Sequence, residues 1–336
     1  MIKVHCLVSC LCEIIKRRGK VDQPPHDLSL DHRPYYLGVW DSAFDVTEQG
    51  AITYYSARTS HDHFIDWYRR FFGIAVAEWY DYDRPKSDNL AAFTELVDNL
   101  SEHQHVIVQI DMSLMPEREN KFAQKPFPHF LMIYKTDDPD EWFMFDPDFR
   151  WEGRMPKARV VEAFMGNADG GGYLVDSSRM LPPTPQVIAA LYEETMRKDA
   201  NELTARLRDI VISMAEGTGG RDLSMLLPAV KQLNIIVIRK YSYDYALMFF
   251  RDQLGLPEEN YEAWCQQIRD LVQVFNSVQY LAIKCSMTGS REHLPQIMAY
   301  LDQADAIEFA IKAEIDRQYR LWKAAVLRPA EEAGAR

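Results

Sequence analysis

The sequence has no long apolar run and no excess of basic residues, and each absence argues against a class of protein. No segment approaches the roughly 20 consecutive apolar residues that a helix needs to cross a bilayer, so we expect no membrane partner. Lysine and arginine together number 38 against 50 acidic residues, which gives a formal net charge of −12. Because nucleic-acid phosphates are bound by basic surfaces, this balance argues against a nucleic-acid partner and would suit a cationic ligand.

Cysteine is scarce as well, and the N-terminus lacks the features of an export signal. Five cysteines, an odd number, in 336 residues do not indicate a disulfide framework. The first residues, MIKVHCLVSCLCEII, carry one lysine, then Glu13, and no small-residue cleavage site, so they do not form a signal peptide. The expectation is a cytoplasmic protein with reduced thiols.

The length exceeds that of a usual single domain, and the character of the sequence changes near its middle. Residues 1–180 mix helix and strand signals, whereas residues 185–328 show helical periodicity almost throughout. A proline-rich segment at 181–186 separates the two parts, and residues 329–336 are predicted to be a frayed tail. We therefore expect an α+β protein with a mixed N-terminal domain, an all-helical C-terminal domain and no internal repeat.

The elements follow from apolar spacing and from turn residues. In the first domain we predict helices over residues 6–18, 62–72, 87–100 and 156–165, and strands over 35–40, 52–55, 105–111, 130–134, 142–145 and 172–176. In the second domain we predict helices over residues 187–214, 223–240, 245–254, 259–283, 294–302 and 304–326. Gly19 and Gly73 are expected helix stops, Ser87 is an expected N-cap, and residues 170–172 are expected to form a flexible turn.

Three chemically capable side chains stand at the ends of predicted elements. Cys6 opens the first helix, His129 opens an apolar strand, and Asp146 ends the next strand. A helix N-terminus favours a negatively charged sulfur, because its first N–H groups lack acceptors. An imidazole can take and return the proton, and a carboxylate can orient the imidazole. The ordered combination therefore predicts a thiol active site of Cys6, His129 and Asp146.

Each of these residues has a plainer interpretation when it is considered alone. A single cysteine is usually a small buried hydrophobe, a single histidine is often structural, and the sequence Asp146-Pro147-Asp148 is typical of a turn. Cys12 is a rival nucleophile. The remaining cysteines are expected to be packing residues, and they are Cys10, Cys265 and Cys285.

The same motifs resemble a known family. Cys6-xxx-Cys10-Leu11, His129-Phe-Leu-Met-Ile and Phe145-Asp146-Pro147 resemble the papain-like fold of bacteriocin-leader peptidases, and more closely the N-terminal domain of the butirosin-biosynthesis acyltransferase H. The chain as a whole is similar to the condensing acyltransferases of petrobactin siderophore biosynthesis. This resemblance implies a papain-like N-terminal domain in which Cys6 is the nucleophile, His129 the general base and acid, and Asp146 the orienting residue.

The resemblance also implies substrates. The donor would be a 3,4-dihydroxybenzoyl thioester on an aryl or acyl carrier protein, and the acceptor a primary amine of a spermidine-type polyamine. The acyl group would pass through an acyl-Cys6 intermediate. No cofactor would be bound permanently, because phosphopantetheine arrives on the carrier protein. An exposed apolar stripe on the extended helical domain would suit the interface of a homodimer.

One departure from the family concerns the oxyanion hole. Leader peptidases have a glutamine several residues before the cysteine, whereas only Met-Ile-Lys-Val-His precedes Cys6 here. The Cys6 backbone N–H is one available donor, and His5 is a candidate for the second unless its side chain faces solvent. Each donor in such a hole is worth about 3–4 kcal/mol in known cases.

Further residues are candidates for a substrate pocket. Aromatic residues gather at 35–40, where Tyr36 and Trp40 stand, and at 79–82, where Tyr80 lies among the carboxylates Glu78 and Asp81. Asp111 ends a predicted strand near the proposed site. Carboxylates interleaved with aromatic faces suit a polyamine, although a solvated acidic loop explains residues 78–83 equally well.

Metal chemistry is not indicated. The pairs His61/His63 and His103/His105 have no companion ligands at suitable spacing, so we expect no metal.

Two alternatives to the acyltransferase stay open at this point. The same residues would serve a papain-like peptidase or amidohydrolase, and the fold would also serve a non-catalytic binding module.

Overall fold

The computed structural model describes residues 5–18, 30–56, 59–118 and 122–327. The chain forms two compact units, one made of Met1–Tyr35 and Asp62–Thr184, the other of Tyr36–His61 and Pro185–Arg336. Residues 36–61 therefore belong to the C-terminal, helical unit although they precede most of the first unit in sequence. Gly19 and the tail at 329–336 lie outside the described residues, so their predicted roles stay predictions.

A six-stranded antiparallel sheet forms the centre of the first unit, with strand order β3-β8-β4-β5-β6-β7. Its strands are β3 (Val76–Glu78), β4 (Gln104–Asp111), β5 (Pro128–Lys135), β6 (Glu141–Asp146), β7 (Trp151–Pro156) and β8 (Gly172–Asp176). The β-branched and apolar runs of β4 and β5 occupy the middle and are almost entirely buried, as such runs should be when both faces are covered.

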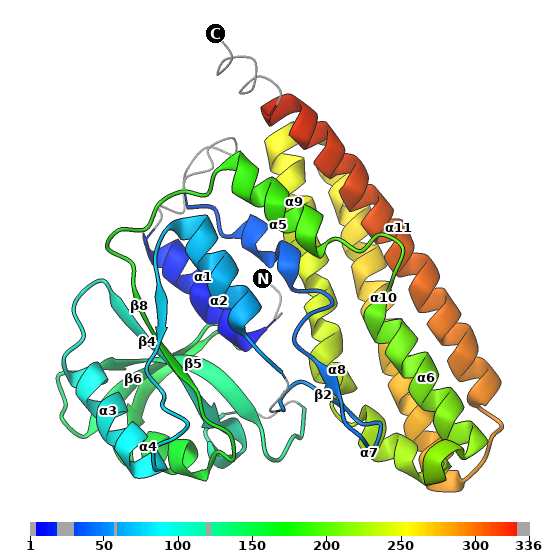
Figure 1. Cartoon of the computed structure of the whole chain (residues 1–336), viewed down its shortest axis with the longest axis horizontal. Helices are drawn as coiled ribbons and strands as arrows, with labels where there is room; N and C mark the ends of the chain where they lie inside the picture. Colours follow the sequence, from blue (N-terminus) through cyan, green and yellow to red (C-terminus); the bar gives the residue numbers. More distant parts are fainter. Residues whose placement is uncertain (1–4, 19–29, 57–58, 119–121, 328–336) are drawn as a thin grey trace. The chain divides into compact units, whose positions relative to one another are not determined.

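Helices cover both faces of this sheet (Figure 1). They are α1 (Cys6–Arg18), α2 (Asp62–Phe72), α3 (Lys86–Asp98) and α4 (Lys157–Gly166), and the short helix η2 (Met112–Leu114) follows β4. The guanidinium of Arg17 in α1 lies over the Tyr134 and Phe145 rings, whereas Phe93 of α3 packs edge-on against Trp142. Because Trp142 and Phe145 are three residues apart on one strand, α1 and α3 occupy opposite faces.

Helix α2 illustrates how sequence spacing becomes packing. Its buried residues recur at helical intervals, at Phe64, Trp67, Tyr68, Phe71 and Phe72. The Tyr68 hydroxyl donates to the Leu11 carbonyl at 3.1 Å, which ties α2 to α1. Gly73 ends the helix with φ of +70° while its N–H bonds to the Arg69 carbonyl, so the predicted stop is confirmed.

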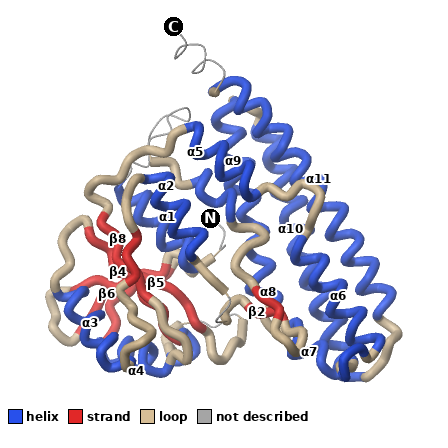
Figure 2. Tube along the Cα trace, viewed as in Figure 1, coloured by secondary structure: helices blue, strands red, loops and turns tan. Residues whose placement is uncertain are grey.

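The second unit is mainly helical, as the sequence predicts (Figure 2). Its elements are β1 (Asp45–Val46), β2 (Ile52–Thr53), α5 (Pro185–Thr195), α6 (Glu202–Glu216), η3 (Thr218–Gly220), η4 (Leu223–Met225), α7 (Leu226–Val230), α8 (Leu233–Val237), η5 (Ile238–Tyr241), α9 (Ser242–Leu254), α10 (Glu258–Thr288) and α11 (Leu294–Val326), and the short helix η1 (Arg33–Gly38) crosses from the first unit into it.

Several boundary predictions are wrong. Residues 35–40 form no strand but lie mostly in η1. The helix predicted over 187–214 is interrupted between α5 and α6, and the one over 223–240 is divided into four short pieces. The helices predicted over 294–302 and 304–326 are one continuous helix, α11. Strands β3 and β7 were not predicted, and the residue before α3 is Pro85, so Ser87 is not an N-cap.

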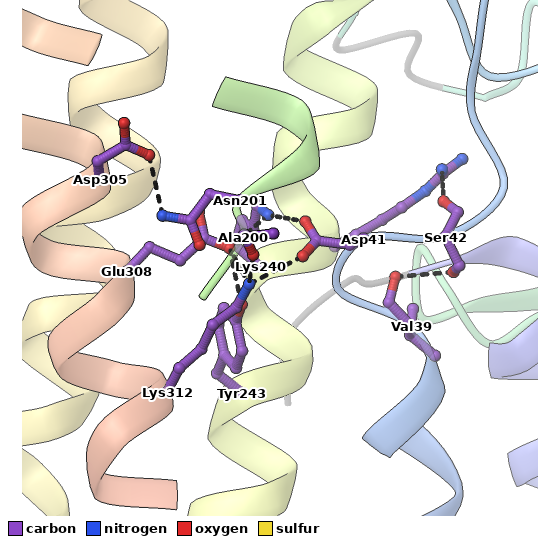
Figure 3. A network of polar contacts seen from close by, with 11 residues as sticks. Val39, Asp41, Ser42, Ala200, Asn201, Lys240, Tyr243, Asp305, Glu308 and Lys312 are labelled. Atoms are coloured by element: carbon purple, nitrogen blue, oxygen red, sulfur yellow. Dashed lines mark hydrogen bonds and ion pairs between the residues drawn. The ribbon is translucent and has the colours of Figure 1, made fainter. Parts of the chain in front are cut away.

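A network of buried charges joins residues 36–61 to the helices of the second unit (Figure 3). The Asp41 carboxylate accepts from Lys240 Nζ at 2.5 Å and from Lys312 Nζ at 3.0 Å. Glu308 accepts from Lys240 Nζ at 2.6 Å and from the Tyr243 hydroxyl at 2.7 Å. The side chains of both lysines and of Glu308 are fully buried, so their charges depend on one another for compensation.

Candidate active site

Cys6 is the first residue of α1 and the most accessible thiol of that helix. The Ser9 N–H donates to the His5 carbonyl at 2.8 Å, so the helical hydrogen bonds begin immediately before Cys6. The N–H groups of the first turn precede any intrahelical acceptor and point toward this end of the helix. Cys6 is partly exposed, whereas Cys10 and Cys12 are fully buried. The helix therefore presents one accessible sulfur at its positive end.

His129 and Asp146 meet at the same edge of the sheet. β5 and β6 run antiparallel, with Met132 opposite Phe145, so the start of β5 lies beside the end of β6. His129 Nε2 is 3.0 Å from Asp146 Oδ1. The Cys6 thiol lies close enough to His129 to contribute to the raised pKa of the imidazole. The structure thus brings Cys6, His129 and Asp146 together, with the imidazole in direct contact with the carboxylate.

The electrostatics of this series favour a charged imidazole. Burial by itself would lower the pKa of His129, but the Asp146 charge, the Asp146 hydrogen bond and the Cys6 thiol together raise the pKa of His129 well above its usual value. Burial would likewise raise the pKa of Asp146, yet its pKa is lowered overall by His129, by the Phe149 N–H and by Arg118. The pair is therefore best described as imidazolium and carboxylate.

Arg118 is a member of the site that the sequence does not identify. Its Nη2 is 3.0 Å from Asp146 Oδ2, the oxygen not bonded to His129, and its guanidinium lies over the Trp151 ring, 4.5 Å from the centroid. The Arg118 side chain is 7% exposed and that of Asp146 is fully buried. Arg118 stands among Glu117, Glu119 and Lys121, a charged run typical of a solvated loop. No feature of the sequence distinguishes Arg118 from the charged residues around it.

Aromatic rings surround the imidazole. Phe149 packs edge-on against His129 at 5.1 Å between centroids, and Phe127 lies 5.7 Å from it. Phe122 contacts both of these phenylalanines at 6.1 Å. His129 is only 2% exposed as a result. This apolar shell keeps bulk water from the His129 ring.

The other thiols are poor nucleophiles in their surroundings. Burial raises the pKa of Cys10 well above its usual value, and its sulfur faces the Phe130 carbonyl at 3.7 Å. In the second unit, burial and the hydrogen bond to Asp244 raise the pKa of Cys265 to about 12. Burial also raises the pKa of Cys285. An uncharged thiol attacks carbonyl carbon slowly, which leaves Cys6 as the candidate nucleophile.

The first-unit residues predicted to contact substrate have varied surroundings. His5 is 5% exposed, which excludes the solvent-facing alternative, and its ring packs against Phe64 at 4.9 Å between centroids. Asp111 is also buried, and its carboxylate accepts the N–H groups of Ser113 and Phe127 at 2.8 and 2.9 Å. The Asp111 carboxylate thus holds the turn after β4 and the residue two before His129.

The predicted acidic and aromatic segment at 78–83 is ordered by its own contacts. Glu78 accepts from the Tyr82 hydroxyl at 3.0 Å, and burial raises the pKa of Glu78. Tyr80 packs against Tyr82 at 5.0 Å between centroids, and Asp81 forms an ion pair with Arg84 at 3.0 Å. The structure does not bring this segment into contact with Cys6 or His129 through any described hydrogen bond.

Tyr36 and Trp40 belong to the second unit, where other tyrosines stack on their rings. Tyr36 lies 4.0 Å from Tyr245 and Trp40 lies 4.7 Å from Tyr243, centroid to centroid, and both pairs are nearly parallel. Tyr36 is 2% and Trp40 3% exposed. Their described contacts are therefore those of core residues in the helical unit.

The glycines at 170–172 are closely packed, so their predicted flexibility is wrong. A Cβ at Gly170 would come within 2.1 Å of the Tyr80 ring, and one at Gly172 within 2.1 Å of the Trp79 ring. Trp79 Nε1 donates to the Ile107 carbonyl at 3.2 Å, which fixes the indole against β4 and β8. Glycine is needed here because two aromatic rings lie directly on the backbone.

The described residues contain neither a cluster of candidate metal ligands nor a helix suited to crossing a membrane. Within them no group of three or more His, Cys, Asp or Glu side chains could hold a metal ion. In the same residues, no helix combines the length and the apolar character that crossing a bilayer requires.

Comparison with known proteins gives matches along the whole chain. Residues 1–180 match the family described as DUF6005 N-terminal domain, and residues 186–336 match DUF6005 C-terminal domain. The chain is also 48% identical over 322 residues to a Bacillus anthracis protein named "Petrobactin synthase", and the alignment covers 96% of each chain.

Proposed function

Because the chain belongs to the DUF6005 family and is a full-length relative of a petrobactin synthase, we propose that it is an enzyme of petrobactin siderophore biosynthesis. In this proposal it is a cysteine-dependent acyltransferase with a papain-like N-terminal domain. Cys6 is the nucleophile, His129 the general acid and base, and Asp146 the residue that orients His129. The acyl group is 3,4-dihydroxybenzoyl, the donor a carrier-protein thioester, and the acceptor a primary amine of a spermidine-type polyamine.

One observation carries the chemical part of the proposal. The partly exposed thiol of Cys6 acts on the pKa of the buried His129, whose Nε2 is 3.0 Å from Asp146 Oδ1. A raised His129 pKa favours the imidazolium, and an adjacent imidazolium favours the thiolate. A thiolate and imidazolium pair of this kind is the resting form that an acyl-transferring cysteine requires.

The first half of the reaction loads the enzyme. The Cys6 thiolate attacks the thioester carbonyl carbon, and a new C–S bond forms to Cys6 Sγ. The bond from that carbon to the phosphopantetheine sulfur breaks, and the imidazolium of His129 protonates the departing sulfur. The products are acyl-Cys6, a free carrier thiol and a neutral His129. In this mechanism the free N–H groups at the start of α1 stabilise the oxyanion that forms transiently.

The second half transfers the acyl group. The neutral acceptor amine attacks the acyl-Cys6 carbonyl carbon, and neutral His129 takes a proton from the nitrogen. The C–S bond to Cys6 then breaks, which releases an amide and restores the thiolate and imidazolium. The exchange of one thioester for another is nearly balanced, so amide formation drives the sequence. The phenylalanines around His129 favour aminolysis because they limit the entry of water.

The proposal is tested by intact-mass spectrometry of the full chain. Incubation with a carrier protein loaded with 3,4-dihydroxybenzoyl should add one dihydroxybenzoyl group, and spermidine should then remove it as an amide. Cys6→Ala should acquire no acyl group. Cys265→Ala is the matched control, because it removes a partly exposed thiol of raised pKa and should load normally.

Other results would point to other functions. An acyl group that persists in Cys6→Ala would refute Cys6 as the nucleophile. Loading followed by release of the free acid at the same rate with and without spermidine would favour the hydrolase alternative. A Cys6 that iodoacetamide modifies no faster than Cys265 near neutral pH would favour a non-catalytic binding module.

A further inference from the structure

We infer that Arg118 is a positioning residue of the site, which keeps Asp146 ionised and aligned during the half of the cycle in which His129 is uncharged. This inference rests on the proposed function for its catalytic consequence. The geometry that supports it stands independently of the substrate.

The two oxygens of Asp146 have separate tasks. Oδ1 lies 3.0 Å from His129 Nε2 and accepts the Phe149 N–H at 3.2 Å, whereas Oδ2 lies 3.0 Å from Arg118 Nη2. Both carboxylate oxygens are therefore hydrogen-bonded, which fixes the orientation of the carboxylate relative to the imidazole. Arg118 reaches the reacting atoms only through Asp146 and His129.

Arg118 is held for this contact at some cost to the fold. Its guanidinium lies over the ring of Trp151 in β7, and its side chain is 7% exposed. Among the described residues, the buried Arg118 Nε has no hydrogen-bond acceptor. A buried N–H without a partner costs about 1–3 kcal/mol, which offsets part of the stabilisation that the ion pair with Asp146 provides.

The need for a permanent cation follows from the proton movements. While His129 is an imidazolium, it balances the charge of the fully buried Asp146. Once His129 has protonated the leaving sulfur, it is neutral, and Asp146 would be an uncompensated buried anion. Arginine keeps its charge at any working pH, so Arg118 maintains the carboxylate until His129 is protonated again.

Apart from His129 and Arg118, the groups shown to act on this site are thiols and carboxylates. Helix α1 contributes the thiols of Cys6 and Cys10, and the loop after β6 contributes Asp148, whose carboxylate accepts from Ser9 Oγ at 2.9 Å. Among the groups that the structure describes at this site, Arg118 is thus the cation that does not take part in proton transfer.

The test compares pH profiles of the full chain. Removing a positive charge raises the pKa of each neighbouring acid or base, so both limbs of the kcat profile in Arg118→Gln should move to higher pH by about one unit. At the optimum, kcat should fall about 10–100-fold with KM for the loaded carrier unchanged. Arg118→Lys keeps the charge, so its limbs should stay at the wild-type pH while kcat falls. Where Arg118→Gln does not fold, Arg118→Met is the neutral variant, since it can still pack on Trp151.

Arg154→Gln is the matched control. Arg154 lies on β7, the strand that carries Trp151, but it is half exposed and pairs with Asp137 and Glu141 instead of with Asp146. Its profile should equal that of the wild type. Arg118 variants that lose activity without any movement of the limbs, or that keep full activity, would overturn the inference and leave Arg118 as a packing residue.

A substrate-free measurement separates this inference from the proposed function. The pH dependence of Cys6 alkylation by iodoacetamide needs no carrier or amine, and its limbs should move upward in the neutral Arg118 variant as well. Acyl transfer absent from the wild type, together with that movement, would refute the proposed function but uphold the role of Arg118. Unmoved alkylation limbs would refute the role of Arg118 even in an active acyltransferase.

Discussion

Replacing Lys240 by methionine should destabilise the helical unit more than any exposed lysine substitution. Lys240 is fully buried and compensates two carboxylates, those of Asp41 and Glu308. Methionine fills similar space but leaves Lys312 as the one cation facing both acids in this described network. Removing one partner of a buried ion pair costs about 3–5 kcal/mol. For a unit of this size, a loss of about 3 kcal/mol lowers the unfolding midpoint by about 6–12 °C.

Circular dichroism at 222 nm reports this transition, because the second unit is mainly helical. The pH dependence of the stability loss in Lys240→Met provides a second test. Burial raises the pKa of Glu308, so the folded state binds this proton more tightly than the unfolded state does. Protonation removes the excess negative charge in the variant, and the loss in Lys240→Met should therefore be smaller at pH 5.5 than at pH 8. In the wild type, burial would raise the pKa of Asp41, but Lys240 and Lys312 lower it overall; in the variant, Lys312 remains beside Asp41.

Two further variants test whether these buried charges depend on one another. Lys284→Met on α10 is exposed and should change stability by no more than about 0.5 kcal/mol. Lys240→Met combined with Glu308→Gln restores charge balance, with Asp41 facing Lys312, and should recover much of the loss. A Lys240→Met protein that melts with the wild type, or a double variant no more stable than the single one, would show that these charges do not depend on one another.

Two other substitutions test the first unit. Asp146→Asn removes the charge that holds His129 protonated, so single-turnover acyl transfer should fall about 10²–10⁴-fold, whereas Asp148→Asn should retain most of it; equal losses in both would contradict the assigned orienting role. Gly172→Ala places a methyl group 2.1 Å from the hydrogen-bonded Trp79 ring and should cost about 1–3 kcal/mol in thermal unfolding. Gly153→Ala, whose methyl group would lie 3.2 Å from Trp151, should cost less, and the reverse order would refute the packing argument.

Sequence spacing predicts the elements whose burial is simple. The residues of α2 alternate at helical intervals, and β4 is a continuous apolar run, so both were located within a residue. The prediction of a strand over 35–40 is wrong for a different reason. Its aromatic residues favour strands by propensity, but Tyr36 and Trp40 are held by stacking on tyrosines of the helical unit, a contact over 200 residues away in sequence.

Helix boundaries in the second unit were predicted poorly where the apolar periodicity of the sequence continues across an interruption of the helix. Pro228 stands within the predicted helix at 223–240, and the chain there divides into η4, α7, α8 and η5. In α11 the opposite occurs. The pattern at 302–304 looks like a boundary, but no proline or glycine interrupts the helix, and it continues for 33 residues. Strand β7 was missed because Trp151–Pro156 contains a glycine, a proline and two charged residues.

The candidate site separates what sequence order can predict from what only folding brings together. Cys6, His129 and Asp146 each stand at an element end, where a residue type has a known chemical use, so their order along the chain was informative. Arg118 does not stand at the end of a helix or strand. It lies in a charged loop, where arginine is common. Its role depends on the burial of Asp146 and on the Trp151 ring beneath it, neither of which spacing reveals.

The two buried charge clusters follow opposite electrostatic designs. In the helical unit, two lysines face two acids, and no described feature requires any of the four to change its charge. In the first unit, the single carboxylate Asp146 has two cations, His129 and Arg118. An excess of one positive charge is unfavourable for a static cluster, because either cation alone would balance the carboxylate. In the proposed mechanism one of these cations, His129, gives up a proton in each turnover, and Arg118 then keeps the Asp146 carboxylate compensated until the proton returns.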